Sequence, residues 1–324
     1  MWLWILLGLV LLLLGALIGA SLYLFRFAVV RGREEKPDFS KEDSIWHPYR
    51  ERMESAQKWL REHTAEHVEI TSFDGLKLRA LLIPAERVVP GEQVTPEEQA
   101  KGTMIVMHGY RSLAEVDFAL EAEFLHNLGY RLLIPYQRSH GESEGTYITY
   151  GVKERFDCRD WARYAERRFG NGPLFLAGIS MGCSTVLMAA GLQLPRNVRG
   201  IIADCGFTSP WEIMAHVARR DFKLPPFPLL YTTSLVCRIA AGFGLREAST
   251  LDAMRHSRIP VLFLHGKEDD FVPVRMTLEN YHACAADKAD KELYLVEGVG
   301  HAQSFAADTA GCEQKIREFI RKQE

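Results

Sequence analysis

Hydrophobic residues at the start of this chain form one nearly unbroken run. Residues 2–25 contain no charged side chain and are mostly Leu, Ile, Val, Ala and Gly. A helix of this length is long enough to cross a bilayer, so the pattern predicts a single transmembrane helix. A signal peptide is the alternative reading, but no Lys or Arg precedes the run and no clean A-x-A site follows it. We therefore expect a membrane anchor over residues 1–30.

A second pattern follows over residues 31–65. A charged linker at 32–41 leads into a segment, 44–62, where apolar side chains recur at steps of three and four. The stripe that they form is typical of an amphipathic helix, and it comprises Ile45, Tyr49, Met53, Ala56 and Leu60. We expect this helix to pack on the body of the protein. A helix that lies on the membrane surface is the alternative.

From residue 66 to 324 the pattern predicts one α/β domain. Two strands, at 68–71 and 76–82, flank an Asp-Gly pair that indicates a hairpin, and a polar insertion at 85–101 indicates a surface loop. Short apolar runs then alternate with amphipathic segments, and the strands begin near 103, 130, 173, 198, 260 and 291. This alternation predicts a mostly parallel sheet with helices on both faces.

Composition excludes some functions. The chain has 324 residues and a formal net charge of −3, whereas a nucleic-acid-binding protein is usually basic. Its six cysteines form no C-x-x-C pair, which is more typical of a reducing compartment than of a disulfide framework. His63 and His67 match an H-x-x-E-H metal motif, but they span the end of a predicted helix and the start of a strand. We therefore expect no metal and no cofactor.

The segment 178–182 reads Gly-Ile-Ser-Met-Gly, with Ser180 at its centre. It follows an apolar strand and precedes a helix of small residues, which is the context of a nucleophile elbow. Glycines on both sides are needed because the serine backbone is strained and the flanking chain passes close to it. Ser180 is therefore the candidate nucleophile, and a glycine-rich turn with an idle serine is the alternative.

A serine needs a base to take its proton and an acid to orient that base. Asp269 follows the strand at 260–264, and His301 follows the last strand, so the order Ser, acid, His matches this kind of fold. Asp270 and Glu268 are rivals for the acid because they stand in the same loop. Asp204, at the end of another strand, is a further alternative.

Two backbone N–H groups are predicted to stabilise an oxyanion. Met181 follows the nucleophile, and Tyr110 lies in the loop after the strand at 103–107. The N–H groups of these two residues are the expected donors. His108, which precedes them, is expected to pack under the site.

These motifs occur in a fixed order along the chain. They are His108-Gly109, the segment 138–145 (Arg-Ser-His-Gly-Glu-Ser-Glu-Gly), the elbow, and the segments around Asp269 and His301. Over residues 66–324 the chain resembles an α/β-hydrolase of the serine-aminopeptidase-like and dienelactone-hydrolase-like branch, which includes cinnamoyl esterases and monoacylglycerol lipase relatives. It departs from that pattern at Tyr136, where relatives often carry an acid, and at Ser139, where they often carry glycine.

Residues 207–253 separate two strands by far more than a typical connection. The segment is rich in large apolar residues and holds four prolines, at 210, 225, 226 and 228. The resemblance implies that this segment forms a cap over the active site, as it does in hydrolases of that family. A compact apolar cap would form an acyl- or aryl-binding pocket.

The sequence as a whole predicts a membrane-anchored serine hydrolase that cleaves a carboxylic ester of a hydrophobic acyl or aryl compound. A peptidase, an amidase or a thioesterase would use the same residues, and a non-catalytic binding protein on a hydrolase scaffold is a further alternative. Arg26, Arg31 and Arg33 follow the apolar run. By the positive-inside rule, these arginines predict a single-pass protein with its catalytic domain in the cytoplasm.

Overall fold

An eight-stranded sheet forms the centre of the computed structural model, which describes residues 1–34, 41–42, 44–85 and 100–324. The strand order is β1-β2-β4-β3-β5-β6-β7-β8, and only β1–β2 and β2–β4 pair in antiparallel fashion. The predicted insertion at 85–101 and the linker at 32–41 lie largely outside the described residues. The strands are β1 Glu66–Thr71, β2 Lys77–Ile83, β3 Gly102–Met107, β4 Tyr130–Pro135, β5 Leu174–Ile179, β6 Val198–Asp204, β7 Val261–Gly266 and β8 Lys291–Val296.

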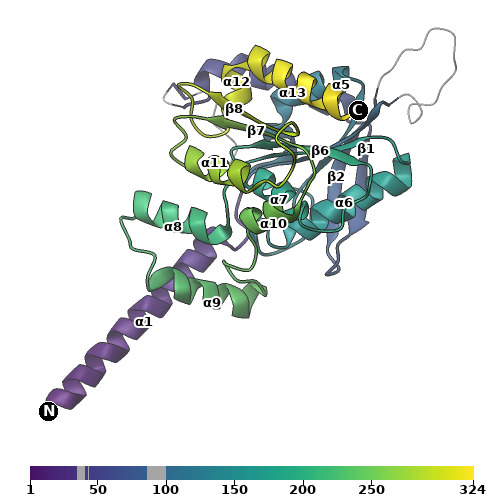
Figure 1. The fold of residues 1–324 in the computed structure, drawn as a ribbon. Coiled ribbons are helices and arrows are strands. Elements are labelled where there is room, and N and C mark those ends of the chain that lie inside the picture. Colours follow the sequence, from purple (N-terminus) through teal and green to yellow (C-terminus); the bar gives the residue numbers. More distant parts are fainter. Residues whose placement is uncertain (35–40, 43, 86–99) are drawn as a thin grey trace, which may run out of the picture.

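Helices cover both faces of the sheet, as the alternating pattern predicts (Figure 1). One face carries α2 Arg50–His63, α4 Ala114–Asp117, α5 Ala119–Asn127, α12 Ser304–Ala307 and α13 Thr309–Gln323. The other face carries α6 Glu154–Phe169, α7 Met181–Ala189, α10 Thr250–His256 and α11 Val274–Ala283. Because both faces are covered, the central strands are buried along their whole length.

The amphipathic segment before the sheet begins its α-helix later than predicted. A short 3-10 turn, η1, spans His47–Tyr49, and α2 starts only at Arg50. Pro48 lacks an N–H and is tolerated only in the first turn of a helix, so the regular α-helix can begin only around this residue. Met53 and Leu60 are buried and α2 packs on α5, so the helix covers the body as predicted.

Two further helices lie between β6 and β7 and form the cap: α8 Pro210–Arg220 and α9 Leu229–Ala241. The predicted cap at 207–253 also includes the start of α10. That helix packs on α7 and α11, and therefore belongs to the body. The predicted range, about 207–253, thus contains both cap helices and overlaps only the start of this body helix.

The apolar N-terminal run forms one helix, α1 Trp2–Ala28, which projects from the body beside α8 and α9 (Figure 1). Within the described residues it is the one helix long and apolar enough to cross a membrane, with a mean hydropathy of 2.7 in its most apolar window. Most of its length is exposed, but Ser21, Phe25 and Ala28 are buried where it packs on α9. The end of α1 is thus part of the packed structure.

Candidate active site

Ser180 stands at a sharp turn between β5 and α7. Its backbone has φ 56° and ψ −117°, a conformation that a residue with a side chain adopts only under strain. A Cβ on Gly182 would lie 1.8 Å from the Met107 carbonyl oxygen, and one on Gly178 would lie 2.4 Å from the Gly182 carbonyl. Both glycines are therefore required by close backbone contacts, as the elbow motif predicts.

The structure brings the three predicted site residues into one hydrogen-bonded chain. His301 Nε2 lies 2.9 Å from Ser180 Oγ, and His301 Nδ1 lies 2.7 Å from Asp269 Oδ2. The Asp269 carboxylate can only accept, so Nδ1–H donates to it and Nε2 is left to accept from the serine hydroxyl. This arrangement can pass the hydroxyl proton to the imidazole while the carboxylate stabilises the charge that forms.

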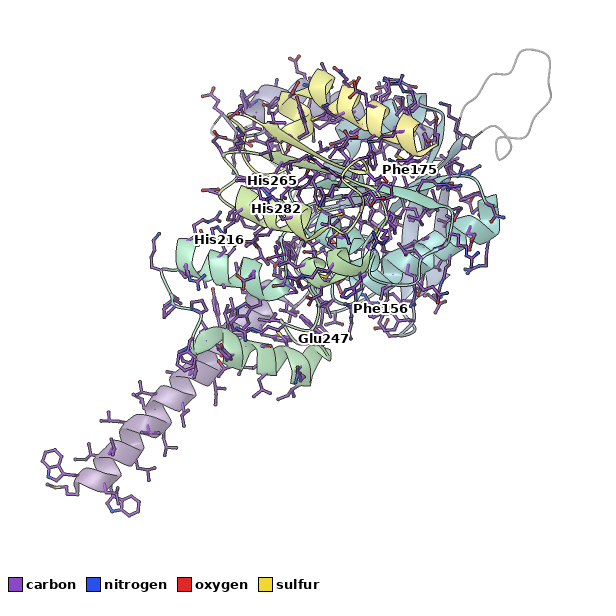
Figure 2. The ribbon with its side chains drawn as sticks, in the orientation of Figure 1. Phe156, Phe175, His216, Glu247, His265 and His282 are labelled. Atoms are coloured by element: carbon purple, nitrogen blue, oxygen red, sulfur yellow. The ribbon has the colours of Figure 1, made fainter. Side chains whose placement is uncertain are left out.

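Asp269 is held as an ionised acceptor. Its Oδ1 accepts the backbone N–H groups of Phe271 at 2.9 Å and Val272 at 2.8 Å. His265 Nε2, inside the body at the end of β7 (Figure 2), lies 3.1 Å from Oδ2. Burial opposes ionisation, but the hydrogen bonds from His265 and His301 hold the pKa of Asp269 well below its usual range. His265 was given no role from the sequence, because its place behind the acid depends on the fold of the loop.

The rival acids point elsewhere. Asp270 is exposed and pairs with Arg220 at 3.4 Å, and Glu268 accepts the Gly298 N–H at 3.2 Å. Asp204 is buried and accepts the Ser304 hydroxyl at 3.2 Å. None of these carboxylates has a hydrogen bond to His301 among those described, so the geometry favours Asp269.

The loop after β3 passes beside the serine. A Cβ on Gly109 would lie 3.3 Å from Ser180 Cβ, so this backbone is in contact with the nucleophile. The Gly109 N–H is donated to Asp117 at 2.6 Å, and the Arg111 N–H to His140 at 3.0 Å. The Tyr110 N–H, between them, remains the predicted oxyanion donor. Asp117 was not singled out from the sequence, since nothing local marks its contact with this loop.

The second predicted donor belongs to Met181, the first residue of α7. N–H groups in the first turn of a helix lack an acceptor within that helix. They also lie at the positive end of the helix dipole, which favours an anion. The two predicted donors therefore flank Ser180 from the β3 loop and from α7.

Two buried histidines support the β3 loop from behind. His108 Nε2 accepts the Gln137 N–H at 3.0 Å, and His140 Nε2 accepts the Arg111 N–H. Burial lowers the pKa of His108 to about 3 and that of His140 to about 4, so both rings stay neutral acceptors at pH 7. His108 therefore packs under the site, as predicted.

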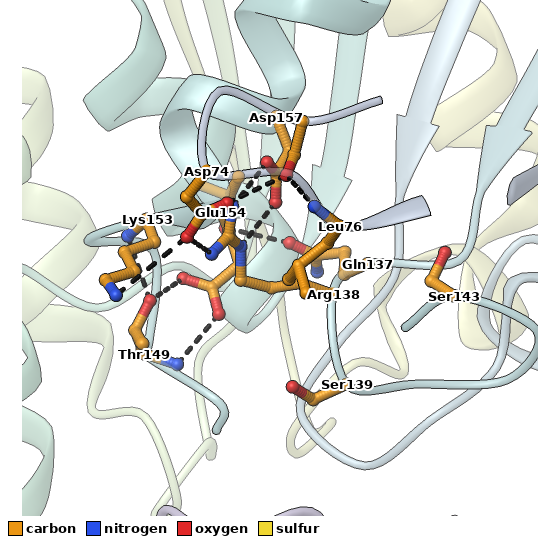
Figure 3. Close-up of polar contacts among 12 residues, drawn as sticks. Asp74, Leu76, Gln137, Arg138, Ser139, Ser143, Thr149, Lys153, Glu154 and Asp157 are labelled. Carbon is orange, nitrogen blue, oxygen red and sulfur yellow. Dashed lines mark hydrogen bonds and ion pairs between the residues drawn. The ribbon is translucent and has the colours of Figure 1, made fainter. Parts of the chain in front are cut away.

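An ion-pair cluster holds the segment that follows β4 (Figure 3). Arg138 donates to both oxygens of Asp157, at 2.6 and 2.7 Å, and to both oxygens of Asp74, at 2.9 and 3.0 Å. Burial alone would lower the pKa of Arg138, but these carboxylates raise it above its usual range. Ser139, which replaces the usual glycine, has φ 65° and donates to the Tyr147 carbonyl at 2.9 Å. The ion pairs of Arg138 hold this segment in place, although the backbone of Ser139 next to it is strained.

A cavity of about 1150 Å³ opens over Ser180 and His301; we call it the Ser180 cavity. Its cap side is apolar and includes Ile213, Met214 and Val217 of α8. His216, also on α8 (Figure 2), bonds the Asp270 carbonyl at 2.7 Å and so ties the cap to the acid loop.

His63 and His67, whose H-x-x-E-H motif we discount as a metal site, contact different residues. His63 stacks on Trp59, and His67 pairs with Glu142 at 3.1 Å. One grouping of ligand atoms appears among the described residues, namely Cys205, Asp269 and His301. Burial raises the pKa of Cys205, which disfavours the thiolate that a metal binds, while the other two residues bond each other.

Comparison with known proteins agrees with this architecture. Residues 98–225 match the family model described as Serine aminopeptidase, S33. The Pyrococcus furiosus esterase Pf2001 superposes with a TM-score of 0.62 at 23% identity, over 82% of this chain and 95% of the esterase. The chain belongs to the α/β-hydrolase superfamily.

Two curated proteins are similar to this α/β-hydrolase in sequence. The protein YqkD of Bacillus subtilis is 29% identical over 80% of this chain and 85% of its own length. Lysophosphatidylserine lipase ABHD12 of Rattus norvegicus is 22% identical over 68% of this chain. This chain aligns with only 56% of the length of ABHD12.

Proposed function

We propose that this α/β-hydrolase is a membrane-anchored serine hydrolase that cleaves carboxylic esters with a hydrophobic acyl or aryl group. The observation that carries the proposal is the hydrogen-bonded chain from Ser180 through His301 to Asp269 at a strained elbow. The esterase and lipase names among its structural neighbours and relatives support an ester as the substrate.

The proposed reaction is acyl transfer in two steps. Ser180 Oγ attacks the ester carbonyl as its proton moves to His301 Nε2, and the N–H groups of Tyr110 and Met181 hold the resulting oxyanion. His301 returns the proton to the leaving alcohol, which leaves an acyl-enzyme. Water then attacks the acyl group with His301 as the base, and the acid and free Ser180 are released. Asp269 orients His301 throughout.

The membrane part of the proposal rests on α1. Its length and lack of charge support a single span over residues 2–25, with the hydrolase body on the cytoplasmic side. The structure weakens one argument for that orientation, because Arg31 donates to the carbonyls of Gly141 and Ser143 and thus has a role within the body. Arg26 and Arg33 are exposed, and the six described cysteines are free and buried, which supports a reducing compartment.

Active-site labelling tests the chemistry. The full chain in a mild detergent is treated with a fluorophosphonate probe, and intact mass is compared between wild type, Ser180→Ala and Ser184→Ala. We expect a single adduct that Ser180→Ala loses and Ser184→Ala keeps, since Ser184 is buried one turn further along α7. No adduct on the folded wild type would favour a non-catalytic binding protein.

A peptidase is the second candidate, because the matching family model is described as a serine aminopeptidase. Esters and aminoacyl amides of matched acyl groups separate the two activities. We expect kcat/KM to be higher for the ester after correction for the intrinsic reactivity of each bond. Preference for a free-amine aminoacyl amide over the acyl ester would support the peptidase.

A further inference from the structure

The end of α1 lines the Ser180 cavity. The lining residues from this helix are Ala20, Tyr23, Leu24, Phe27 and Ala28. They fall at steps of three and four, so they share one face of the helix. On the adjacent face, Ser21 contacts Thr232 of the cap and Phe25 packs on Tyr147, and both are buried. The helix therefore contacts the cap with one face and borders the cavity with the other.

The end of α1 is also bonded to the loop that passes beside Ser180. The last carbonyls of a helix have no partner within it. Here the Tyr110 hydroxyl donates to the Ala28 carbonyl at 2.9 Å, the Tyr150 hydroxyl donates to the same oxygen at 2.8 Å, and Arg111 donates to the Phe27 carbonyl. Just beyond the helix, the Ile148 N–H donates to the Val29 carbonyl at 2.7 Å. These bonds fix α1 relative to the predicted oxyanion donors.

The cavity opens on its apolar side. Phe222 and Leu224, in the loop between α8 and α9, line the cavity yet keep nearly half of their surface exposed. Tyr23 of α1 also lines it and is 67% exposed. The cavity volume exceeds the range of about 300–1,000 Å³ that is usual for drug-sized ligands. A long apolar group has room to lie between α1 and the cap and to extend outward along the apolar helix.

We propose that the last two turns of α1 are part of the binding site for the acyl chain of the substrate, so that Leu24 and its neighbours set the preferred chain length. The inference rests on the proposed ester hydrolysis and goes further than it. The helix is then an anchor and a specificity element at once. The ligand class is a long, unbranched acyl ester, such as a lipid with a single tail.

A matched pair of variants tests this role. Leu24→Trp adds bulk on the cavity face, whereas Leu22→Trp makes the same change at a residue that is 51% exposed and does not line the cavity. The full chain is reconstituted in nanodiscs, and kcat/KM is measured for p-nitrophenyl acetate and p-nitrophenyl laurate. The readout is the laurate-to-acetate ratio, which does not depend on the fraction of folded enzyme.

A single methylene in an apolar site changes kcat/KM by about 10- to 200-fold. We expect Leu24→Trp to lower the ratio by at least about tenfold and Leu22→Trp to change it less than about twofold. Ala20→Trp, at an exposed position on the same cavity face, should lower the ratio as well and covers the case in which Leu24→Trp does not fold. A ratio equal to that of wild type in every folded cavity-face variant, Leu24→Trp and Ala20→Trp, would overturn the inference.

Failure of the inference is distinct from failure of the proposed function. If the wild-type chain hydrolyses neither ester and takes no fluorophosphonate at Ser180, the serine hydrolase assignment is wrong. If it hydrolyses both esters and the α1 variants leave the ratio unchanged, the function stands and α1 has no part in chain selection.

Discussion

On the sheet side of the Ser180 cavity, polar groups are fixed by backbone geometry. Ser180 is held by a strained turn between two required glycines, and Asp269 is held by two N–H groups of its own loop. On the opposite side, α1, α8 and α9 meet through apolar side chains, many of them partly exposed. We expect most substitutions on the sheet side to reduce activity or stability, because each polar group there is held in one position. On the second side, which we call the helix side, apolar residues of different sizes can replace one another, because apolar contact has no direction.

The strongest test of this contrast is Asp269→Asn. The amide keeps the size of the side chain but no longer fixes the imidazole with Nδ1–H donating, so we expect kcat for ester hydrolysis to fall by about 10⁴-fold. Folding should be retained, and thermal unfolding followed by tryptophan fluorescence checks this. A loss of less than tenfold in a folded variant would mean that Asp204 or another carboxylate supports His301.

Next in size is the effect of a methyl group at the elbow. Gly182→Ala would place a Cβ 1.8 Å from the Met107 carbonyl, so backbone must move. We expect a destabilisation of more than about 4 kcal/mol or a failure to fold. Gly172→Ala is the control, because its Cβ would meet no described atom closer than 3.9 Å and should change stability by less than about 0.5 kcal/mol. Similar thermal midpoints for the two variants would contradict the packing argument.

Acid should lower the free energy of unfolding, because two histidines are buried on the sheet side. The pKa values of His108 and His140 fall from about 6.5 in the unfolded chain to about 3 and 4 in the fold, so the unfolded chain binds more protons between those values. Stability is therefore fully present above pH 6.5 and falls as pH drops, by up to about 1.4 kcal/mol per pH unit for each histidine. Unfolding at pH 4.5, 5.5, 6.5 and 7.5 measures the slope.

His140→Gln checks the source of that slope. The glutamine oxygen can still accept the Arg111 N–H but does not titrate, so the variant should show a shallower fall of stability with acid. A slope equal to that of wild type would assign the acid sensitivity to other groups.

The smallest expected effect lies on the helix side. Ser21 Oγ and Thr232 Oγ1 lie 2.5 Å apart and form a polar contact between α1 and α9. Ser21→Ala should cost only about 0.5–1.5 kcal/mol of unfolding free energy, because apolar contacts around it remain. Thr232→Val should cost a similar amount, and the double variant should cost little more than either single one. Fully additive losses would show that the two hydroxyls act separately.

The sequence predicts the sheet side well for a physical reason. Ser180, Asp269 and His301 each follow a strand, β5, β7 or β8, of one mostly parallel sheet, and the carboxyl ends of such strands lie at one edge. Local motifs with this spacing therefore predict residues that meet in space. The superfamily is recognisable for the same reason, since its motifs stand at fixed places in the fold.

The helix side was predicted less well. A uniformly apolar run such as α1 has no polar face, so nothing in the sequence indicates that residues 20–28 border a cavity. Contacts such as Tyr150 with Ala28 join segments more than a hundred residues apart, and the sequence carries no local sign of them.

The bonds at the end of α1 also impose an order on biogenesis. The helix is synthesised well before Tyr110 and Tyr150, which bond its last turn, and before Thr232, which contacts Ser21. Until Tyr150 has left the ribosome, the carbonyls at the end of α1 lack some of their partners, and Ser21 lacks Thr232 for longer still. Although α1 precedes the hydrolase body in the chain, it reaches its final environment only after much of that body is made, and a nascent chain has to keep this apolar helix apart from other apolar surfaces in the meantime.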